Sequence, residues 1–468
     1  MQLFKGHKFW GYIRRVRDQL STIDMTEGKP WKKLLLFTMP LLVGNLFQQV
    51  YSIADAIFLG RFVGDDALAA VGGAIPIFFL VIVILSGVAV GAGIMVAQYF
   101  GAKSRVDLSH TIAVSITLVT IVGLIMMIFG PLGTRPLLVL LNTPAEILDD
   151  SVLYINMMLW GILGMAYFNI LSGILRGLGD AFWPLVYLMV SCILNIVLNF
   201  TFIVVLGMGV LGAALGTVIA QGISSVLCFL RLLTMKDVFD MNLRYFLPQR
   251  KYVSMLLKLG IPAGVSHAIF AVGMMIVQPL VNYFGPLFIA VNVIVMRIDS
   301  FVMMPNFSFG SAMTVYTGQN VGADKMDRIT LGVKQCCIMA VVTASVIVGI
   351  ILLFAGPIAG VFTQTGEVID LSVRMLWILA PGYIAFSINM VLWGVIRGAG
   401  DAMSPLWGAL VNTLVVRLPT AFIFVHFMGR PEALMYSLLA GWVSNTLIGI
   451  FVYLRGKWRM KGIVEELV

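Results

Sequence analysis

Length, composition and charge place this chain in a membrane. Its 468 residues are 60% hydrophobic and only 11% are charged, whereas charged residues make up about a quarter of an ordinary soluble domain. So little charge cannot cover a water-facing surface of this size, but it suits a chain whose outer wall contacts lipid. The net charge of +9 does not indicate nucleic-acid binding, because the basic residues flank apolar segments, as the positive-inside rule describes.

Twelve apolar segments are long enough to cross a bilayer, which takes about 20 mainly apolar residues. The connections between them alternate between basic and acidic or nearly neutral. This alternation predicts a multi-pass protein of the plasma (cytoplasmic) membrane with both termini in the cytoplasm. The predicted spans are 34–59, 69–98, 109–133, 152–175, 184–206, 210–233, 254–283, 288–317, 330–355, 370–395, 405–427 and 434–454.

The two halves of the chain repeat each other. The segment LRGLGDAFWPL, which begins at Leu175, returns as IRGAGDAMSPL from Ile396, an offset of 221 residues. The same offset places Gln98 on Gln319. Two copies of six spans predict an all-α membrane protein of two six-helix bundles, related by a pseudo-twofold axis along the membrane normal. Two such lobes predict transport by alternating access.

The domain organisation follows from the spans and the repeat. The first residues are basic and aromatic, which is typical of an amphipathic helix on the cytoplasmic face. The expected parts are a cytoplasmic amphipathic arm at 1–31, an N-terminal lobe at 32–233, a cytoplasmic linker at 234–251, a C-terminal lobe at 252–455 and a cytoplasmic tail at 456–468.

No pattern in the sequence predicts an enzyme or an ATP-driven pump. The histidines His7, His110, His267 and His426 are scattered, and the chain has no HExxH motif, no paired intramembrane aspartates and no Walker motif. The four cysteines lie in apolar runs, where they are expected to be buried small hydrophobes. We expect no cofactor and no metal site other than one for Na⁺.

A polar stripe marks the first span. Asn45, Gln48, Ser52 and Asp55 recur at steps of 3, 4 and 3 residues, which places them on one helix face. An ionisable side chain at the bilayer centre costs about 2.5–3.5 kcal/mol, so it needs a partner, a cavity or an ion. We expect the stripe to face the interior of the lobe and Asp55 to bind H⁺ or Na⁺. The alternative is an interfacial acid in contact with water, because Arg61 follows closely.

The fifth span carries Ser191, Asn195 and Asn199 at four-residue spacing, again on one face. Amide oxygens can bind Na⁺ or form hydrogen bonds with an aspartic acid. Polar packing between helices explains the same pattern. The pattern alone does not choose between the two.

The second half has its own polar candidates. Asp299 and Asn306 share a face of span eight, and two interpretations of Asp299 remain open. It pairs with Arg417 of span eleven, or it faces a central cleft and meets a cationic substrate. His267 is expected to be a satisfied core histidine rather than a proton carrier. The candidates for the substrate cavity are Gln48, Gln49, Asp299, Asn306, His267 and Arg417.

Over residues 32–455 the chain resembles the multidrug and toxic compound extrusion (MATE) family of bacterial transporters. The matching segments are SIADAIFLGRFVGDDALAAVG, GAGIMVAQYFGAK, both RGxGD connections and VLGAALGT, which ends at Thr217. The resemblance implies a V-shaped pair of six-helix bundles that exports cationic and amphipathic compounds in exchange for H⁺ or Na⁺.

The resemblance also assigns roles to residues of the first half. Asp55 falls on the first-helix carboxylate of the family, Asn195 on its fifth-helix asparagine and Thr217 on its sixth-helix threonine. Asn199 stands where the DinF-like branch has an aspartate. The implied cation-coupling site of Asp55, Asn195, Asn199 and Thr217 therefore has one carboxylate where that branch has two, which should weaken Na⁺ binding.

The NorM-like branch uses acids in its seventh and tenth helices, and those positions hold Phe270 and Phe386 here. That site does not carry over, so the chain has mixed DinF-like and NorM-like features. The sequence predicts a monomeric secondary active multidrug efflux antiporter for small organic molecules, with membrane lipids as its other partners. The alternative is a flippase for a lipid or a lipid-linked saccharide, which the small number of buried basic residues, Arg297 and Arg417, disfavours.

Overall fold

The computed structural model describes residues 22–141 and 143–463, and within these ranges the chain contains helices and no strand. Most of the predicted N-terminal arm lies outside the described residues. Eleven helices are long and apolar enough to cross a membrane. The remaining span is a pair of helices, α5 (Ala145–Trp160) and α6 (Ile162–Gly177), which are bent by 52° at their junction. The predicted all-α fold class with twelve spans is confirmed.

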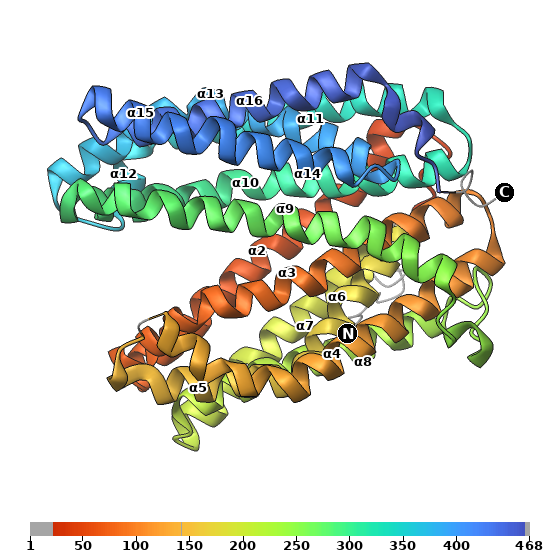
Figure 1. The fold of residues 1–468 in the computed structure, drawn as a ribbon, viewed down its shortest axis with the longest axis horizontal. Helices are drawn as coiled ribbons and strands as arrows, with labels where there is room; N and C mark the ends of the chain where they lie inside the picture. The colour runs from red at the N-terminus through yellow and green to blue at the C-terminus, as the bar shows by residue number, and fades with distance from the viewer. Residues whose placement is uncertain (1–21, 142, 464–468) are drawn as a thin grey trace, which may run out of the picture. The chain divides into compact units, whose positions relative to one another are not determined.

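Figure 1 shows the order of the helices along the chain. The first half contains α2 (Pro30–Phe62), α3 (Asp65–Gly101), α4 (Arg105–Leu140), the α5–α6 pair, α7 (Phe182–Asn199), the π-helical turn η1 (Phe200–Val205) and α8 (Gly209–Leu233). The linker holds a short 3₁₀ turn, η2 (Leu243–Phe246). The second half contains α9 (Arg250–Tyr283), α10 (Gly285–Gly322), α11 (Met326–Leu353), α12 (Ala355–Gly360), α13 (Gly366–Gly398), α14 (Met403–Leu410), the π-helix η3 (Val411–Arg417), α15 (Leu418–Met428), α16 (Glu432–Arg455) and η4 (Lys457–Met460).

Packing groups the chain into two compact units. Unit 1 contains Met39–Ile261 together with the described residues up to Met25, and unit 2 contains Thr26–Thr38 together with the described residues from Pro262 onward. The division falls inside α2 and inside α9, next to a proline in each helix. A proline removes a backbone hydrogen bond from a helix, so the chain passes between units where its helical ladder is interrupted. The lobe bounds 32–233 and 252–455 stay a prediction.

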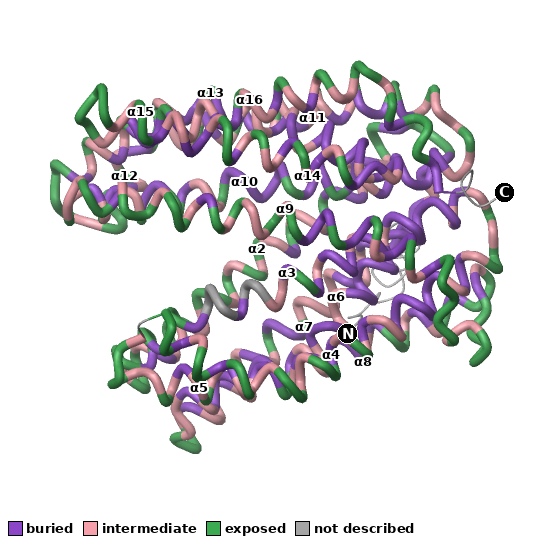
Figure 2. The backbone as a smooth tube through the Cα atoms, viewed as in Figure 1, coloured by how far each residue is buried: buried purple, intermediate pink, exposed green. Residues whose placement is uncertain are grey.

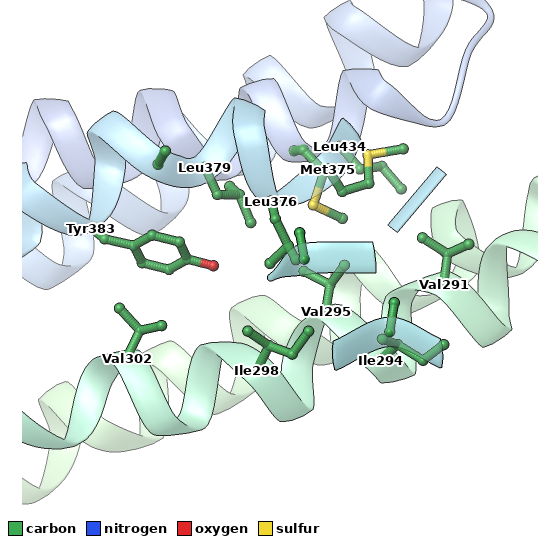
Figure 3. Packing of buried hydrophobic residues seen from close by; sticks show 14 of the residues in the cluster. Val291, Ile294, Val295, Ile298, Val302, Met375, Leu376, Leu379, Tyr383 and Leu434 are labelled. Atoms are coloured by element: carbon green, nitrogen blue, oxygen red, sulfur yellow. The ribbon is translucent and has the colours of Figure 1, made fainter. Parts of the chain in front are cut away.

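The core of unit 2 lies between α10 and α13. Val291, Val295, Ile298 and Val302 recur at steps of 4, 3 and 4 residues, which gives α10 one apolar face. This face packs against Leu376, Leu379 and Tyr383 of α13 (Figure 3). Most helices bury one side in this way and leave turns on the other side exposed (Figure 2). The exposed apolar side is what a lipid-facing surface requires.

Small residues allow the central helices to approach closely, and the two units use them in the same way. A Cβ atom added at Gly173 or Gly177 of α6 would lie 2.9 or 2.8 Å from a carbonyl oxygen of α3. The matching residues in α13, Gly394 and Gly398, would lie 2.4 and 2.3 Å from carbonyl oxygens of α10. Membrane helices often pack through such small residues four apart. The sequence repeat is therefore also a repeat of packing.

Charged side chains fix the segments that lead into α9 and α2. In unit 1, Arg105 binds both carboxylate oxygens of Asp240, at 2.9 and 2.7 Å, which holds the linker against α4. This paired geometry holds the pKa of the exposed Asp240 carboxyl below its usual value. In unit 2, Lys325 donates to the carbonyl oxygen of Thr26 at 3.0 Å. Each first helix of a half thus begins from an anchored segment.

The connection between α6 and α7 requires glycine at position 179. Gly179 has a φ of +89°, and an added Cβ would lie 2.4 Å from the carbonyl oxygen of Ile23. Ile23 also donates its backbone N–H to the Gly179 carbonyl at 2.9 Å. Beside it, the buried Asp180 pairs with Arg231 at 2.9 Å. Burial nevertheless raises the pKa of Asp180 to about 6.

We expect Gly179→Ala to lower the thermal unfolding midpoint of the detergent-purified protein more than Gly207→Ala does. Both glycines have positive φ, so both variants carry a backbone strain of about 1–2 kcal/mol. Only position 179 adds a clash, because nothing lies within 4 Å of a Cβ at position 207. Equal shifts in the two variants would contradict the packing of Ile23 against this connection.

Candidate functional site

The candidate site lies where α2, α7 and α8 meet inside unit 1. The Asp55 carboxylate accepts a hydrogen bond from the side-chain amide of Asn199. The same amide nitrogen donates to Oδ1 of Asn195 at 3.1 Å, and the Asn195 amide donates to the Thr217 hydroxyl at 3.3 Å. The structure therefore brings all four predicted coupling residues into one chain of hydrogen bonds. Asn195, Asn199 and Thr217 are buried, and Asp55 is half-buried.

Two tyrosines border this network, and the sequence analysis did not select them. Tyr51 lies one helical turn before Asp55 and donates its hydroxyl hydrogen to Thr217 at 3.0 Å. Tyr154 of α5 packs against the apolar cluster around Leu59, which is one turn after Asp55 on α2. The four-residue spacing from Asp55 was a signal for Tyr51. No sequence signal pointed to Tyr154, because its position depends on how α5 packs.

One buried acceptor in the network has no hydrogen-bond partner among the described residues. It is Oδ1 of Asn199, whose side chain is 0% exposed. The oxygen lies over Gly216 of α8, where an added Cβ would be 2.3 Å away. Hard cations take carboxylate, amide and hydroxyl oxygens as ligands. The Asp55 carboxylate, this free oxygen and the Thr217 hydroxyl are oxygen groups of the kind that bind Na⁺, but the Asn199 amide turns its N–H rather than this oxygen toward Asp55.

The polar stripe of α2 does not face the lobe interior as a whole. Gln48 and Ser52 are exposed, and the Ser52 hydroxyl donates to the Gln48 carbonyl at 3.1 Å. Asn45 and Gln49 are half-buried, like Asp55. The expectation of a stripe that points inward along its whole length is wrong. A stripe of four residues spreads around part of the helix, and only the part that faces α7 and α8 is covered.

In unit 2, Asp299 and Arg417 have different partners. Asp299 of α10 accepts a hydrogen bond from the hydroxyl of Tyr383 on α13, whose ring points toward α10 (Figure 3). The guanidinium of Arg417 lies over the ring of Phe270 on α9, with its Cζ atom 5.5 Å from the ring centroid. The interpretation that pairs Asp299 with Arg417 is therefore wrong. The reason is packing, because α10 pairs with α11 and α13, whereas η3 packs on α14, α15 and α16.

The other cavity candidates of unit 2 differ in burial. Asn306 is fully buried, and neither its amide nitrogen nor its oxygen has a partner within the described ranges. His267 is exposed, so the expectation of a satisfied core histidine is wrong. Of the cysteines, Cys192, Cys228 and Cys336 are buried and Cys337 is half-buried, and all four are free thiols. No group of three or more metal-binding side chains occurs among residues 22–141 and 143–463.

Comparison with known proteins places this architecture in a family. The MatE family model matches the chain twice, at residues 40–201 and 262–423. The chain belongs to the MatE family. The two matched ranges begin at corresponding prolines, Pro40 and Pro262, so each range covers one copy of the repeat found in the sequence. The predicted membership of the MATE transporters is therefore confirmed, and the chain is a multi-span membrane protein of a transporter family.

Relatives of this MatE chain are similar over almost their whole length. The probable multidrug resistance protein YoeA of Bacillus subtilis is 27% identical over 96% of this chain and 98% of its own length. A solved outward-facing multidrug resistance MATE family transporter of the MOP superfamily matches with a TM-score of 0.87 and 26% identity, over 95% and 99% of the two chains. A MOP superfamily transporter from Pyrococcus furiosus, described by the reverse polarity of its binding pocket, matches with a TM-score of 0.84 and 26% identity, over 94% and 98%.

We expect Gly216→Ala to disrupt the network by pushing Asn199 away from α8. The loss of stability that Gly216→Ala causes should depend on the Asn199 side chain. A double-mutant cycle that combines Gly216→Ala with Asn199→Ala tests this dependence. In the Asn199→Ala background, Gly216→Ala should cost at least 1 kcal/mol less than in the unchanged protein, since the clashing oxygen is gone. Gly222→Ala on the same helix is the control, because nothing lies within 4 Å of its added Cβ. Additive effects in a thermal unfolding assay would contradict the contact.

Proposed function

We propose that this chain is an antiporter that exports small organic compounds in exchange for a cation that binds at Asp55. The observation that carries the proposal is the hydrogen-bond network that joins Asp55 to α7 and α8. A carboxylate within a membrane span is costly and is retained where it binds a partner or an ion. Asp55 has an amide as its partner rather than a basic residue, so its negative charge is not cancelled within the site.

The proton is the better candidate for the coupling ion. Asp55 is the only acid in the network, and Asn199 turns an N–H rather than an oxygen toward it. Such a donor points its positive end at the carboxylate and so opposes a metal cation at the same place. Na⁺ would need the amide to rotate and present Oδ1. A proton needs no rearrangement of ligands, because it converts the Asp55 carboxylate from an acceptor into a donor.

Cation binding can act on the transport cycle through α2. Only an ion that binds one conformation better than another shifts the equilibrium between them. Ionised Asp55 accepts the Asn199 hydrogen bond, whereas protonated Asp55 would also carry a donor for which the network must find an acceptor. The Oδ1 atom of Asn199, which has no partner among the described residues, is the acceptor that we propose for this role. Because α2 continues past Pro40 into residues grouped with unit 2, a change in its packing at Asp55 acts on a helix that both units share.

We expect Asp55→Asn to reduce export driven by a pH gradient at least tenfold. The measurement is counterflow in proteoliposomes, with imposed pH or Na⁺ gradients and a panel of fluorescent organic cations. Asp66→Asn is the control, because Asp66 is exposed at the start of α3 and joins no part of the network. Export by Asp55→Asn that still follows the pH gradient would contradict the proposal. Export by the unchanged protein that is driven by a Na⁺ gradient alone would identify Na⁺ rather than H⁺ as the coupling ion.

We expect Asn199→Asp to make the transporter respond to Na⁺. The substitution replaces the amide with a second carboxylate, so the site gains one negative charge and exchanges the amide nitrogen for one more oxygen ligand. In the same proteoliposomes, an imposed Na⁺ gradient should then drive export at least threefold faster than in the unchanged protein. Asn195→Asp adds an acid one turn earlier on α7, at a side chain that bonds to Asn199 and Thr217 rather than to Asp55, and serves as the matched control. A Na⁺ response that is equal in the two variants would contradict the assigned geometry.

A further inference from the structure

We propose that Arg417 binds the anionic group of an aromatic organic substrate inside unit 2. This inference rests on the proposed function, because it names a class of compound that the transporter would carry. The group is a carboxylate or sulfonate on an aromatic body. The site differs in charge from the one around Asp55 and lies in the other unit.

The first support is the depth at which the charge lies. Arg417 is near the middle of the span Met403–Met428, and it is only 7% exposed. An arginine at the centre of a span carries a large desolvation cost, and such a residue is by default a candidate for function. Membrane arginines near helix ends avoid the cost by reaching the interface, which a central position does not allow.

The second support is that the guanidinium has no counter-ion among the described residues. No acidic side chain forms an ion pair with Arg417, and no described residue accepts a hydrogen bond from its guanidinium. The buried Asp180 of unit 1 shows the contrasting case, since Arg231 donates to it at 2.9 and 3.0 Å. A buried arginine with a structural role is normally paired in this way. Arg417 therefore has hydrogen-bond donors to offer to a ligand.

The third support is that the surroundings hold Arg417 in place. Its carbonyl oxygen accepts a hydrogen bond from the Ser437 hydroxyl of α16 at 2.8 Å. Its guanidinium lies over Phe270, a ring that is 49% exposed. An aromatic ring beneath a guanidinium leaves the N–H groups at the edge free, and these bind a carboxylate with two parallel hydrogen bonds. Arg417 also ends the π-helix η3, and π-helical turns are frequent at functional sites.

The ring beneath the guanidinium suggests the body of the ligand. Phe270 is 49% exposed, so one face of its ring can contact a bound aromatic group. Gly441 of α16 also lies next to Arg417, and a Cβ added at that glycine would be 3.5 Å from the Arg417 Cβ. The basic and aromatic groups together favour an aromatic anion over a simple inorganic one.

The experiment measures binding to the full-length protein in neutral detergent by isothermal titration calorimetry. The probes are 2-naphthoate and its uncharged analogue 2-naphthamide, which differ in the anionic group. We expect naphthoate to bind at least tenfold more tightly than naphthamide. Arg417→Gln should remove this difference, and Arg417→Lys should reduce it severalfold, because lysine keeps the charge but not the paired geometry. Arg297→Gln should leave the difference unchanged, because Arg297 on α10 is exposed and not buried as the sequence analysis expected.

Equal binding of naphthoate and naphthamide would overturn the proposal, as would an equal loss in Arg417→Gln and Arg297→Gln. If Arg417→Gln does not fold, the test uses Arg417→Lys instead. An unchanged preference of Arg417→Lys for naphthoate over naphthamide then overturns the proposal. Inorganic sulfate and phosphatidylglycerol are tested as competitors. Naphthoate binding that neither competitor displaces supports the proposal, whereas binding of phosphatidylglycerol without naphthoate assigns the site to a lipid headgroup and overturns it. The assay needs no ion gradient, so Asp55→Asn should bind naphthoate normally, and failure of cation coupling stays distinguishable from failure of this site.

Discussion

The hydrocarbon interior of a membrane offers no hydrogen-bond partner, and this constraint decides most of the structure. Every backbone group must be satisfied within its own segment, so the described chain crosses as helices and contains no strand. Few charges remain within the spans, and each needs an explanation. Asp55 is held by Asn199 and Asp299 by Tyr383, while Arg417 has a ring beside it and no acid. The partner that each of these three residues has, or lacks, therefore bears directly on what we propose that the protein transports.

The repeat builds the scaffold twice, but it does not build the polar sites twice. Gly173 and Gly394 let the central helices approach in the same way in both units. At an offset of 221 or 222 residues, Asp55 falls on Ile276 or Val277, and at 221 Arg417 falls on Ile196. Each charged residue thus stands opposite an apolar one in the other half. Close helix packing is shared because both halves need it, whereas the charges belong to one half each.

In the network around Asp55, a single acid is surrounded by neutral polar side chains. Its neighbours are amides and hydroxyls, which can donate or accept hydrogen bonds. Asn195 and Asn199 are both buried and linked by a hydrogen bond. A change in the charge of Asp55 would therefore alter hydrogen bonds on α7 and, through Thr217, on α8. A salt bridge at the same place would fix one charge state. The amide network leaves both charge states available, which is what the proposed cation coupling needs.

The sequence by itself determined the twelve helices, the repeat and the family, because apolar length, residue spacing and repeated segments are properties of the chain alone. It also selected Asp55, Asn195 and Asn199 by helical spacing and by the family resemblance, and Thr217 by the resemblance alone. Only the tertiary structure decided which partners these residues meet. It added Tyr51, Tyr154 and Gly216 to the site, exposed His267, and separated Asp299 from Arg417. The physical reason is that spacing fixes the face of a helix on which a side chain lies, whereas packing fixes what lies opposite that face.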